Sequence, residues 1–214
     1  MARLKTAVLI SGRGSNLQAL AASCAAPGFP AEITLVISNQ PKAAGLDHAT
    51  RAGIPAKIVP HRDYETREEF EAAIDKILRG AGIELVCLAG FMRVLTSHFV
   101  DSWRGKLVNI HPSLLPDFPG LDTHRRALEA HKRFAGCSVH FVSAEIDAGP
   151  LIVQAKVPVL PDDDEPALAA RVLEAEHKAY PLALRLIAER RVRLKGDKVE
   201  IDGKPGPFML PPAR

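Results

Sequence analysis

The chain has 214 residues, of which 47% are hydrophobic and 25% charged, and its formal net charge is +3. This composition is typical of a globular protein and excludes disordered, fibrous and membrane-embedded classes. Lys and Arg are interspersed with Asp and Glu, so the charge pattern predicts no nucleic acid partner. The pI of about 8.8 is compatible with an anionic small substrate.

The cysteines and the apolar runs indicate the cellular compartment in which the protein is expected. Cys24, Cys87 and Cys137 are odd in number and without metal-type spacing, which predicts buried thiols in a reducing, cytoplasmic protein. The first apolar run, Thr6–Ile10, is too short for a signal peptide and indicates a strand instead. No apolar run approaches the roughly 20 residues that cross a bilayer, so we expect no membrane partner.

Short apolar runs alternate with helix-periodic segments as far as residue 110. This pattern predicts an α/β fold with a mostly parallel, twisted, Rossmann-like sheet of about seven strands and helices on both faces. The strands expected in this part are Ala7–Ser11, Glu32–Ser38, Ala56–Val59, Leu85–Ala89 and Leu107–Ile110. The helices expected between them are Asn16–Cys24, Ala43–Ala52, Thr66–Arg79 and Thr96–Val100.

The C-terminal part is expected to add antiparallel strands. After a loop at 111–122, the pattern predicts a helix at Thr123–Lys132, strands at Ser138–Ser143 and Leu151–Pro158, and a long helix at Pro166–Glu189. The acidic cluster Asp162–Glu165 is interpreted as the cap of that helix rather than a metal site. Residues 191–203 alternate about a Gly-Asp turn and predict a hairpin, followed by a loose Pro-rich and Gly-rich tail. We expect one domain at 1–189 and an appendage at 190–214.

The segment Leu107–Pro116 carries the strongest chemical signal. Asn109 and His111 lie two apart on an expected strand and so project from one face, while Ile110 points into the core. An imidazole titrates near neutral pH, and an amide can donate hydrogen bonds to a developing oxyanion. The pair therefore predicts a proton-transfer site, although a purely structural hydrogen-bonding pair would leave the same local pattern.

The first glycine-rich turn, Ser11–Asn16, follows a strand and opens a helix, where backbone N–H groups can face a phosphate. Leu17 occupies the place of the third glycine of a dinucleotide fingerprint. The turn therefore favours a single phosphate, with hydrogen bonds added by Ser15 and Asn16. The alternative is that Asn16 only caps the helix.

Carboxylates recur in the segment Glu145–Pro150. Asp147 could support a protonated His111 and raise its pKa, although Asp-Ala-Gly-Pro also reads as plain turn chemistry. Glu145 is interpreted as solvent-facing, and His140 as a satisfied, half-buried histidine within a strand. Because no His, Cys and carboxylate set has a metal spacing, we expect a site without metal.

Five ordered motifs then resemble one family. They are Ser11-Gly-Arg-Gly-Ser-Asn16, Leu88-Ala-Gly-Phe-Met-Arg93, Asn109-Ile-His-Pro-Ser-Leu-Leu-Pro116, Ser138-Val-His-Phe-Val142 and Asp147-Ala-Gly-Pro-Leu-Ile-Val-Gln154. From about residue 5 to about 185 the chain resembles the folate-dependent phosphoribosylglycinamide formyltransferases and their formyltransferase fold. The resemblance implies formyl transfer from 10-formyltetrahydrofolate, as co-substrate, to the amine of 5′-phosphoribosylglycinamide in de novo purine biosynthesis.

The resemblance also implies a role for each site residue. Asn109 would hold the oxyanion, His111 would move protons, and Asp147 would orient His111. The substrate phosphate would bind at Gly14, Ser15 and Asn16, and its ribose or glycinamide part at Glu176, a residue that otherwise reads as an exposed helical carboxylate. The folate would contact Arg67, Met92, Arg93, Val94, Leu95, Asn109, Ser143, Ala144, Glu145, Ile146 and Asp147. Without the resemblance, Arg67 and Arg93 read as surface charges.

One position departs from the family pattern. Bacterial relatives often carry Gly-Leu-His-Thr-His where this chain has Gly120-Leu-Asp-Thr-His124. The change leaves Asn109, His111 and Asp147 in place and questions only a catalytic or water-ordering role at Asp122. The oligomeric state is expected to be a monomer or a homodimer.

Three other functions fit parts of the pattern. A methionyl-tRNA formyltransferase shares the Asn-x-His-Pro motif but is expected to carry a further C-terminal domain. A formyltetrahydrofolate deformylase is expected to carry a regulatory domain before the glycine-rich strand, where this chain starts. A dinucleotide-binding domain without catalysis would need the third glycine.

Overall fold

The computed structural model describes residues 2–211 and divides into two compact units between Asn109 and Ile110. The first unit contains β1 (Leu4–Ile10), α1 (Ser15–Ala25), β2 (Ala31–Ser38), α2 (Gly45–Arg51), β3 (Ala56–Ile58), η1 (His61–Asp63), α3 (Arg67–Gly80), β4 (Leu85–Leu88), α4 (Ser97–Ser102) and most of β5 (Leu107–His111). The alternation of strands and helices that the sequence predicts is therefore confirmed.

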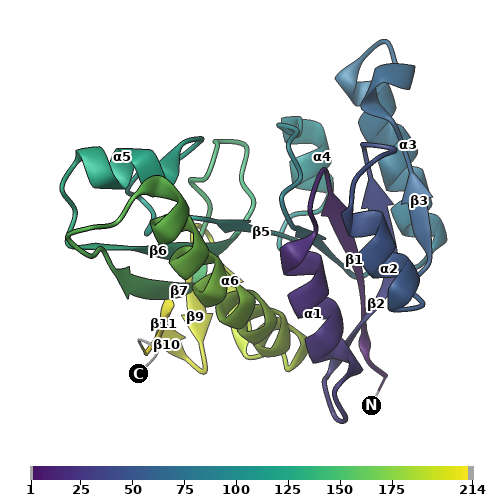
Figure 1. Cartoon of the computed structure of the whole chain (residues 1–214). Coiled ribbons are helices and arrows are strands. Elements are labelled where there is room, and N and C mark those ends of the chain that lie inside the picture. The colour runs from purple at the N-terminus through teal and green to yellow at the C-terminus, as the bar shows by residue number, and fades with distance from the viewer. Residues whose placement is uncertain (1, 212–214) are drawn as a thin grey trace. The chain divides into compact units, whose positions relative to one another are not determined.

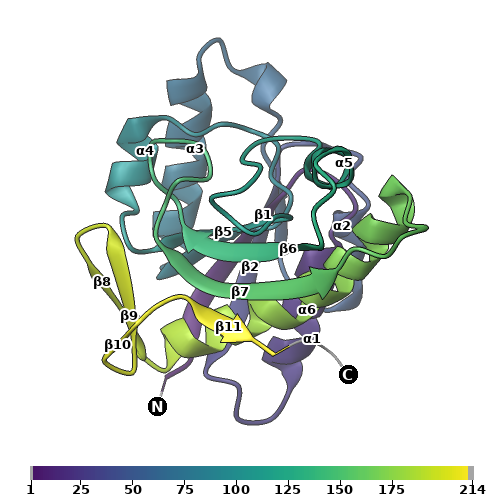
Figure 2. The same cartoon turned by 90° about the vertical axis from the view of Figure 1, so that its left-hand side faces the viewer.

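The strands of the first unit form a parallel sheet. β1 pairs with β2 on one side and with β4 on the other, and β3 extends the sheet beyond β2. Figures 1 and 2 show α1 and α2 on one face of these strands and α3 and α4 on the other. Right-handed crossovers produce this arrangement, because the chain moves outward from β1 to β3 and then returns to β4. The strand order reverses between β1 and β4.

The core of the first unit comes from strands that are apolar on both faces. Residues 7–10 of β1 have no exposed surface, and all four residues of β4 are buried. A strand covered by helices on both sides needs such a run, as the sequence analysis expected. At the start of α3, Thr66 and Glu69 form a reciprocal capping box, and the helix begins at the predicted position.

The second unit is built on an antiparallel pair of strands. β6 (Phe134–Phe141) pairs with β7 (Leu151–Pro158), and both contact the long helix α6 (Glu165–Ala188). The carboxylate of Asp164 accepts the N–H of Ala167, which confirms the predicted acidic cap. A shorter helix, α5 (Thr123–Glu129), precedes β6. Strand β6 starts four residues earlier than expected because Phe134 already pairs with Pro158.

The C-terminal residues contain more structure than the sequence predicts. β8 (Val192–Lys195), β9 (Lys198–Ile201) and β10 (Lys204–Pro205) form a three-stranded antiparallel sheet, which confirms the hairpin. The prediction of a loose tail is wrong, because β11 (Phe208–Leu210) pairs in parallel with residues 153–155 of β7. Pro and Gly suggest a loop, yet three apolar residues between prolines suffice for a short edge strand.

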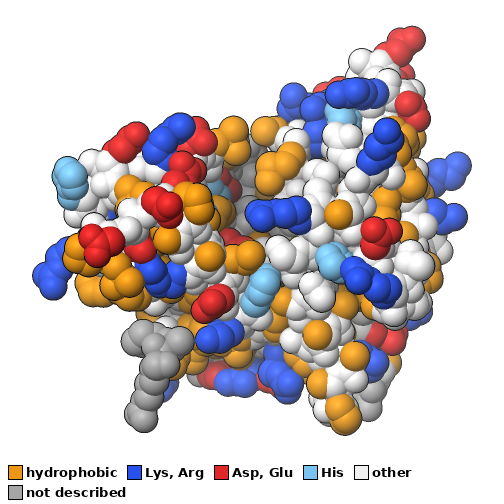
Figure 3. Space-filling view, in the orientation of Figure 1, with side chains coloured by type: hydrophobic (Ala, Val, Ile, Leu, Met, Phe, Trp, Pro, Cys, Tyr) orange, Lys and Arg blue, Asp and Glu red, His pale blue; other side chains and the backbone are white. Residues whose placement is uncertain are grey.

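The main sheet has eight strands in the order β11-β7-β6-β5-β4-β1-β2-β3, one more than expected. Within residues 2–211, no helix combines the length and apolar character needed to span a bilayer. Basic and acidic side chains are interspersed on the face drawn in Figure 3, consistent with the small net charge.

Candidate active site

Strand β5 carries the first two predicted catalytic residues. Leu107, Val108 and Ile110 are 1%, 0% and 7% exposed, so the strand is anchored by its apolar residues. Asn109 pairs in register with Leu88 of β4 and remains half-buried, whereas His111 ends the strand and is buried. The two polar residues therefore lie on a rigid element, which is what precise positioning of a reacting group requires.

His111 and Asp147 are brought together within the second unit. Nδ1 of His111 lies 3.2 Å from Oδ2 of Asp147, and its Nε2 lies 2.9 Å from the carbonyl oxygen of Phe118. Because a carbonyl only accepts, Nε2 carries the proton of that hydrogen bond. The same Asp147 oxygen accepts the backbone N–H of Gly120 at 2.8 Å. The carboxylate thus ties the loop after β5 to the segment before β7.

The loop after β5 is held by buried polar side chains from the neighbouring strands. The Ser138 hydroxyl accepts the N–H of Leu115 at 3.0 Å and donates to the carbonyl of Ser113 at 2.7 Å. The amide of Gln154 donates to the carbonyl of Leu115 at 2.9 Å. Ser138 and Gln154 are 0% and 8% exposed, so these bonds form away from water and define the path of the loop.

Two non-glycine residues of the site have left-handed backbone conformations. φ is +53° at both Phe118 and Asp147, a region that L-residues rarely adopt. Such backbone strain persists only where surrounding contacts impose it, and it concentrates at functional sites. At Phe118 it accompanies the hydrogen bond between the carbonyl and His111, and at Asp147 the contacts of the carboxylate.

Burial determines the titration of the histidine. Burial lowers the pKa of His111 below its ordinary value, although the Phe118 carbonyl and the Asp147 carboxylate act in the opposite direction. The predicted contribution of Asp147, which raises this pKa, is confirmed, but the net shift is downward because the cost of a buried positive charge outweighs the attraction. For Asp147, burial acts upward, but hydrogen bonds from His140 and Gly120 and the two histidines together lower its pKa.

His140 is a residue of the site that sequence reasoning missed. It is 2% exposed rather than half-buried, its Nδ1 lies 2.9 Å from the carbonyl oxygen of Phe141, and its Nε2 lies 3.7 Å from Oδ1 of Asp147. Asp147 therefore has a histidine at each carboxylate oxygen. The available signal was the alternation along β6, which places His140 two residues after Ser138 on the same side. No local sequence pattern predicts that the backbone carbonyl of Phe118 accepts a hydrogen bond from His111.

The glycine-rich turn of the first unit approaches the start of α2 very closely. Gly14 has φ +76° and precedes α1, and a Cβ on it would lie 2.5 Å from the Cα of Gly45. The N–H of Gly45 donates to the carbonyl of Gly12 at 3.0 Å. Gly14 is the N-cap of α1, and no side chain caps the helix, so the alternative role of Asn16 as a helix cap is wrong. Ser15 and Asn16 instead occupy the first turn of α1.

The residues predicted to contact the folate lie in segments with different exposure. Met92 and Val94 are 67% and 52% exposed, and Leu95 is buried. Arg93 is half-buried, and its Nε has no hydrogen-bond partner among the described residues. Arg67 is exposed at the first position of α3. Exposed apolar side chains beside a guanidinium suit a ligand that is flat, apolar and anionic at one end.

The loop at 143–147 is also open to solvent. Ala144, Glu145 and Ile146 are exposed, and the exposure of Ile146 reaches 58%. The hydroxyl of Ser143 donates to the carbonyl of Glu145 at 3.0 Å. The solvent-facing Glu145 that the sequence predicts is confirmed.

Glu176 is not the exposed carboxylate that its helical pattern suggests. It lies on α6 and is 7% exposed. The pKa of the Cys137 thiol is raised mainly by burial of that thiol and secondly by the nearby negative charge of Glu176. Burying a carboxylate costs free energy of folding unless the group is paired or hydrogen-bonded. All three cysteines are buried, as predicted, and burial raises the pKa of Cys24 to about 11.

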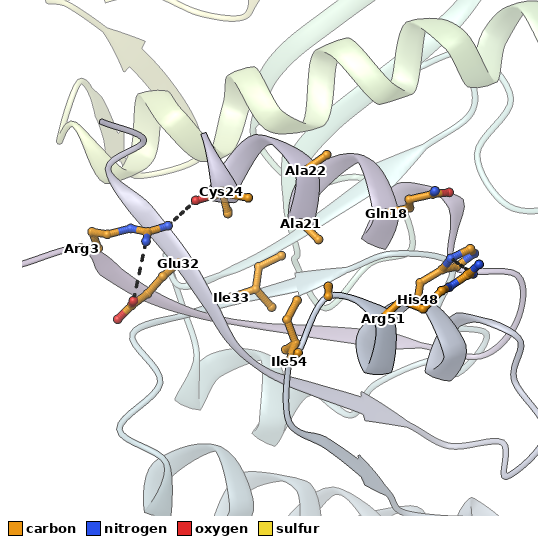
Figure 4. A pocket seen from close by; sticks show the side chains of 13 residues that line it. Arg3, Gln18, Ala21, Ala22, Cys24, Glu32, Ile33, His48, Arg51 and Ile54 are labelled. Atoms are coloured by element: carbon orange, nitrogen blue, oxygen red, sulfur yellow. Dashed lines mark hydrogen bonds and ion pairs between the residues drawn. The ribbon is translucent and has the colours of Figure 1, made fainter. Parts of the chain in front are cut away.

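A separate cavity of about 570 Å³ lies in the first unit between α1, β2 and α2. Figure 4 shows Gln18, His48 and Arg51 at one end and Arg3 and Glu32 at the other, with apolar side chains between them. None of the predicted site residues lines it, so it is not the proposed reaction site. Among residues 2–211, His, Cys, Asp and Glu form no cluster of three suited to a metal ion. The metal-free site stays a prediction.

The comparisons with known proteins agree on one family. The model of the family described as Formyl transferase matches residues 4–184. The Drosophila melanogaster trifunctional purine biosynthetic protein adenosine-3 is 54% identical over 86% of this chain, but the chain spans only 14% of that relative. Phosphoribosylglycinamide formyltransferase from Escherichia coli is 42% identical over 96% of this chain and 95% of its own length.

A solved structure agrees with both sequence comparisons. Phosphoribosylglycinamide formyltransferase from Coxiella burnetii has a TM-score of 0.94 and 42% sequence identity to this chain. The match covers 98% of this chain and 100% of that one. The chain therefore belongs to the formyl transferase family and, within it, to the phosphoribosylglycinamide formyltransferases.

Proposed function

We propose that the protein transfers a formyl group from 10-formyltetrahydrofolate to the amine of 5′-phosphoribosylglycinamide, a step of de novo purine biosynthesis. The buried contact between the imidazole of His111 and the carboxylate of Asp147, at the end of a strand that also carries Asn109, is the observation that carries this proposal. It supplies an imidazole that can accept a proton beside one amide donor, which acyl transfer to an amine requires.

The reaction proceeds by addition and elimination. The substrate amine attacks the formyl carbon and forms a C–N bond, and the carbonyl oxygen becomes an oxyanion that the amide of Asn109 stabilises. The ammonium group then loses a proton, and N10 of the folate gains one as its bond to the formyl carbon breaks. His111 moves this proton, because its lowered pKa keeps the imidazole neutral and able to accept it. Asp147 stabilises the imidazolium that forms.

The substrate amine belongs to a phosphorylated ribose, which needs its own anchor. Gly14, Ser15 and Asn16 open α1, where backbone N–H groups face outward and no side-chain cap occupies them. Glu176 accepts hydrogen bonds from the ribose or the glycinamide part of the substrate. The buried position of its carboxylate supports this role, because a carboxylate away from bulk water forms strong hydrogen bonds with a hydroxyl or amine group.

The folate is held by Arg67, Met92, Arg93, Val94, Leu95 and the loop Ser143–Asp147. The exposed side chains of Met92, Val94 and Ile146 provide apolar surface for the pterin, and the two arginines attract the glutamate carboxylates. Residues 1–189 carry the reaction, and residues 190–214 support the fold. The protein works in the cytoplasm without metal, as a monomer or a homodimer.

A direct assay tests the function. Purified protein is incubated with 10-formyltetrahydrofolate, with and without 5′-phosphoribosylglycinamide and in the presence of a chelator. We expect tetrahydrofolate to form only with the acceptor and the acceptor to gain one formyl group by mass spectrometry. Release of formate at the same rate with or without the acceptor would instead identify a deformylase.

A further inference from the structure

Ser11 links the two loops that follow β1 and β4. Its hydroxyl donates a hydrogen bond to Oδ1 of Asn39 at 2.6 Å and accepts the backbone N–H of Met92 at 2.8 Å. Its own N–H donates to the carbonyl of Gly90 at 3.1 Å. The first residue of the glycine-rich turn is thereby bonded to the first residue of the segment 92–95.

The place of this link in the sheet is informative. β1 and β4 are neighbours, and the strand order reverses between them. In open α/β sheets, ligands bind beside the carboxyl ends of the strands at such a reversal, where the two following loops separate. Ser11 follows β1 directly and Met92 lies in the loop after β4, so the Ser11 hydroxyl links the two loops at this reversal.

Asn39 sets the orientation of the Ser11 hydroxyl. Asn39 follows β2 directly and is 1% exposed. Its side-chain Nδ2 lies 3.2 Å from Nδ1 of His61. The amide oxygen of Asn39 takes the only hydroxyl proton of Ser11, so that only lone pairs remain for the N–H of Met92. The chain of hydrogen bonds therefore runs in one direction, from Met92 through Ser11 to Asn39.

We propose that Ser11, oriented by Asn39, is a positioning residue that sets the register of the phosphate-binding turn against the folate-binding segment. The proposal rests on the proposed function, because it assigns Gly14–Asn16 to the phosphate and Met92–Leu95 to the folate. Without the hydroxyl, the N–H of Met92 loses its acceptor, and only the backbone bond from Ser11 to the Gly90 carbonyl still joins the two loops, so the position of Met92 is less well defined. The substrates then bind less well while the reacting groups on β5 stay intact.

The test separates binding from chemistry. We expect Ser11→Ala to raise the KM for 10-formyltetrahydrofolate about tenfold, the effect of one lost hydrogen bond between ordered groups. The Kd of tetrahydrofolate, measured by calorimetry, should rise by a similar factor, and kcat should change less than about threefold. Ser102→Ala is the matched control, because that hydroxyl donates within α4, to the carbonyl of Phe99 at 2.8 Å, and should leave these values unchanged.

Two more variants complete the test. Ser11→Thr keeps a hydroxyl at this position and should restore both the KM and the Kd. Asn39→Ala should weaken folate binding as well, and Ser11→Ala/Asn39→Ala should be no weaker than Ser11→Ala alone.

Three outcomes would overturn the proposal. They are a Ser11→Ala variant with an unchanged Kd, failure of Ser11→Thr to restore binding, and strictly additive effects of the two alanine substitutions. The Kd measurement needs no turnover, so failure of this proposal is distinct from failure of the wild-type protein to transfer a formyl group.

Discussion

The buried carboxylate of Glu71 accepts both hydrogen bonds that Thr96 can donate. Glu71 is 3% exposed on α3, and it receives the backbone N–H of Thr96 at 2.8 Å as well as the Thr96 hydroxyl. Thr96 follows Leu95 directly and caps α4 by accepting the N–H of Phe99. The pair therefore anchors the far end of the segment whose near end is bonded to Ser11.

Glu71→Gln should destabilise the protein by about 1–3 kcal/mol, because one of the two acceptor oxygens becomes an NH₂ group facing a donor. Urea unfolding with a common m-value gives the measurement. Glu68→Gln is the control, since Glu68 is exposed in the first turn of the same helix and should cost only a few tenths of a kcal/mol. Equal losses in both variants would contradict the anchoring role.

The pair of His111 and Asp147 should control turnover rather than folding. His111→Ala and Asp147→Asn are each expected to lower kcat at least about 100-fold, the contribution of a positioned proton-transfer group. Asp117→Asn serves as the control, because Asp117 lies on the same loop with its carboxylate paired to Lys132 at 2.7 Å on the surface. Near-normal turnover of both active-site variants would remove these residues from the mechanism.

Acid should destabilise the folded state through three histidines. Burial lowers the pKa of His111, His124 and His177. In the unfolded chain these groups bind protons near their ordinary pKa of about 6.5, above their folded pKa values, so the unfolded state binds more protons in that window. The free energy of unfolding should therefore fall as pH drops through about 6.5.

His124→Gln should flatten this dependence. The variant lacks one group that binds a proton more readily in the unfolded chain than in the folded protein. Chemical unfolding at a series of pH values between about 5 and 8 measures the slope. The wild-type protein at constant ionic strength is the reference. A slope that stays the same in the variant would show that His124 does not contribute.

Gly149 lets the chain turn back onto β6 two residues after Asp147. A Cβ there would lie 1.8 Å from the carbonyl oxygen of Phe141, far closer than non-bonded heavy atoms can approach. Gly149→Ala should therefore displace the loop, cost more than about 2 kcal/mol of stability and lower kcat, as strain at a tightly packed position does. In Gly80→Ala the new Cβ meets open space at the end of α3, so stability should rise or stay level.

The family departure at Asp122 should have little effect on catalysis. Its carboxylate is 53% exposed and pairs with Arg125 at 2.5 Å, and its φ of +57° is a conformation that Asp tolerates better than most residues. We expect Asp122→His to change kcat/KM by less than about threefold at neutral pH. A larger increase, measured with both substrates varied, would show that a histidine contributes at this position.

The sequence predicts what local patterns encode. Apolar runs such as those of β1 and β4 identify buried parallel strands, and the period of two places Asn109 with His111. What escapes prediction depends on contacts between distant segments. His140, the carbonyl of Phe118 and the N–H of Gly120 reach His111 or Asp147 only after the loops have folded. The net pKa of His111 depends on burial, which a motif does not report.

The short strand β11 has a consequence for how the protein behaves at high concentration. Without it, β7 would present a row of unpaired backbone groups, which is a template for pairing with another chain and for aggregation. β11 fills that edge over residues 153–155 and is itself bracketed by Pro207 and Pro211, which have no N–H to offer an incoming strand. The C-terminal segment thus covers part of the edge at which a second chain could otherwise pair.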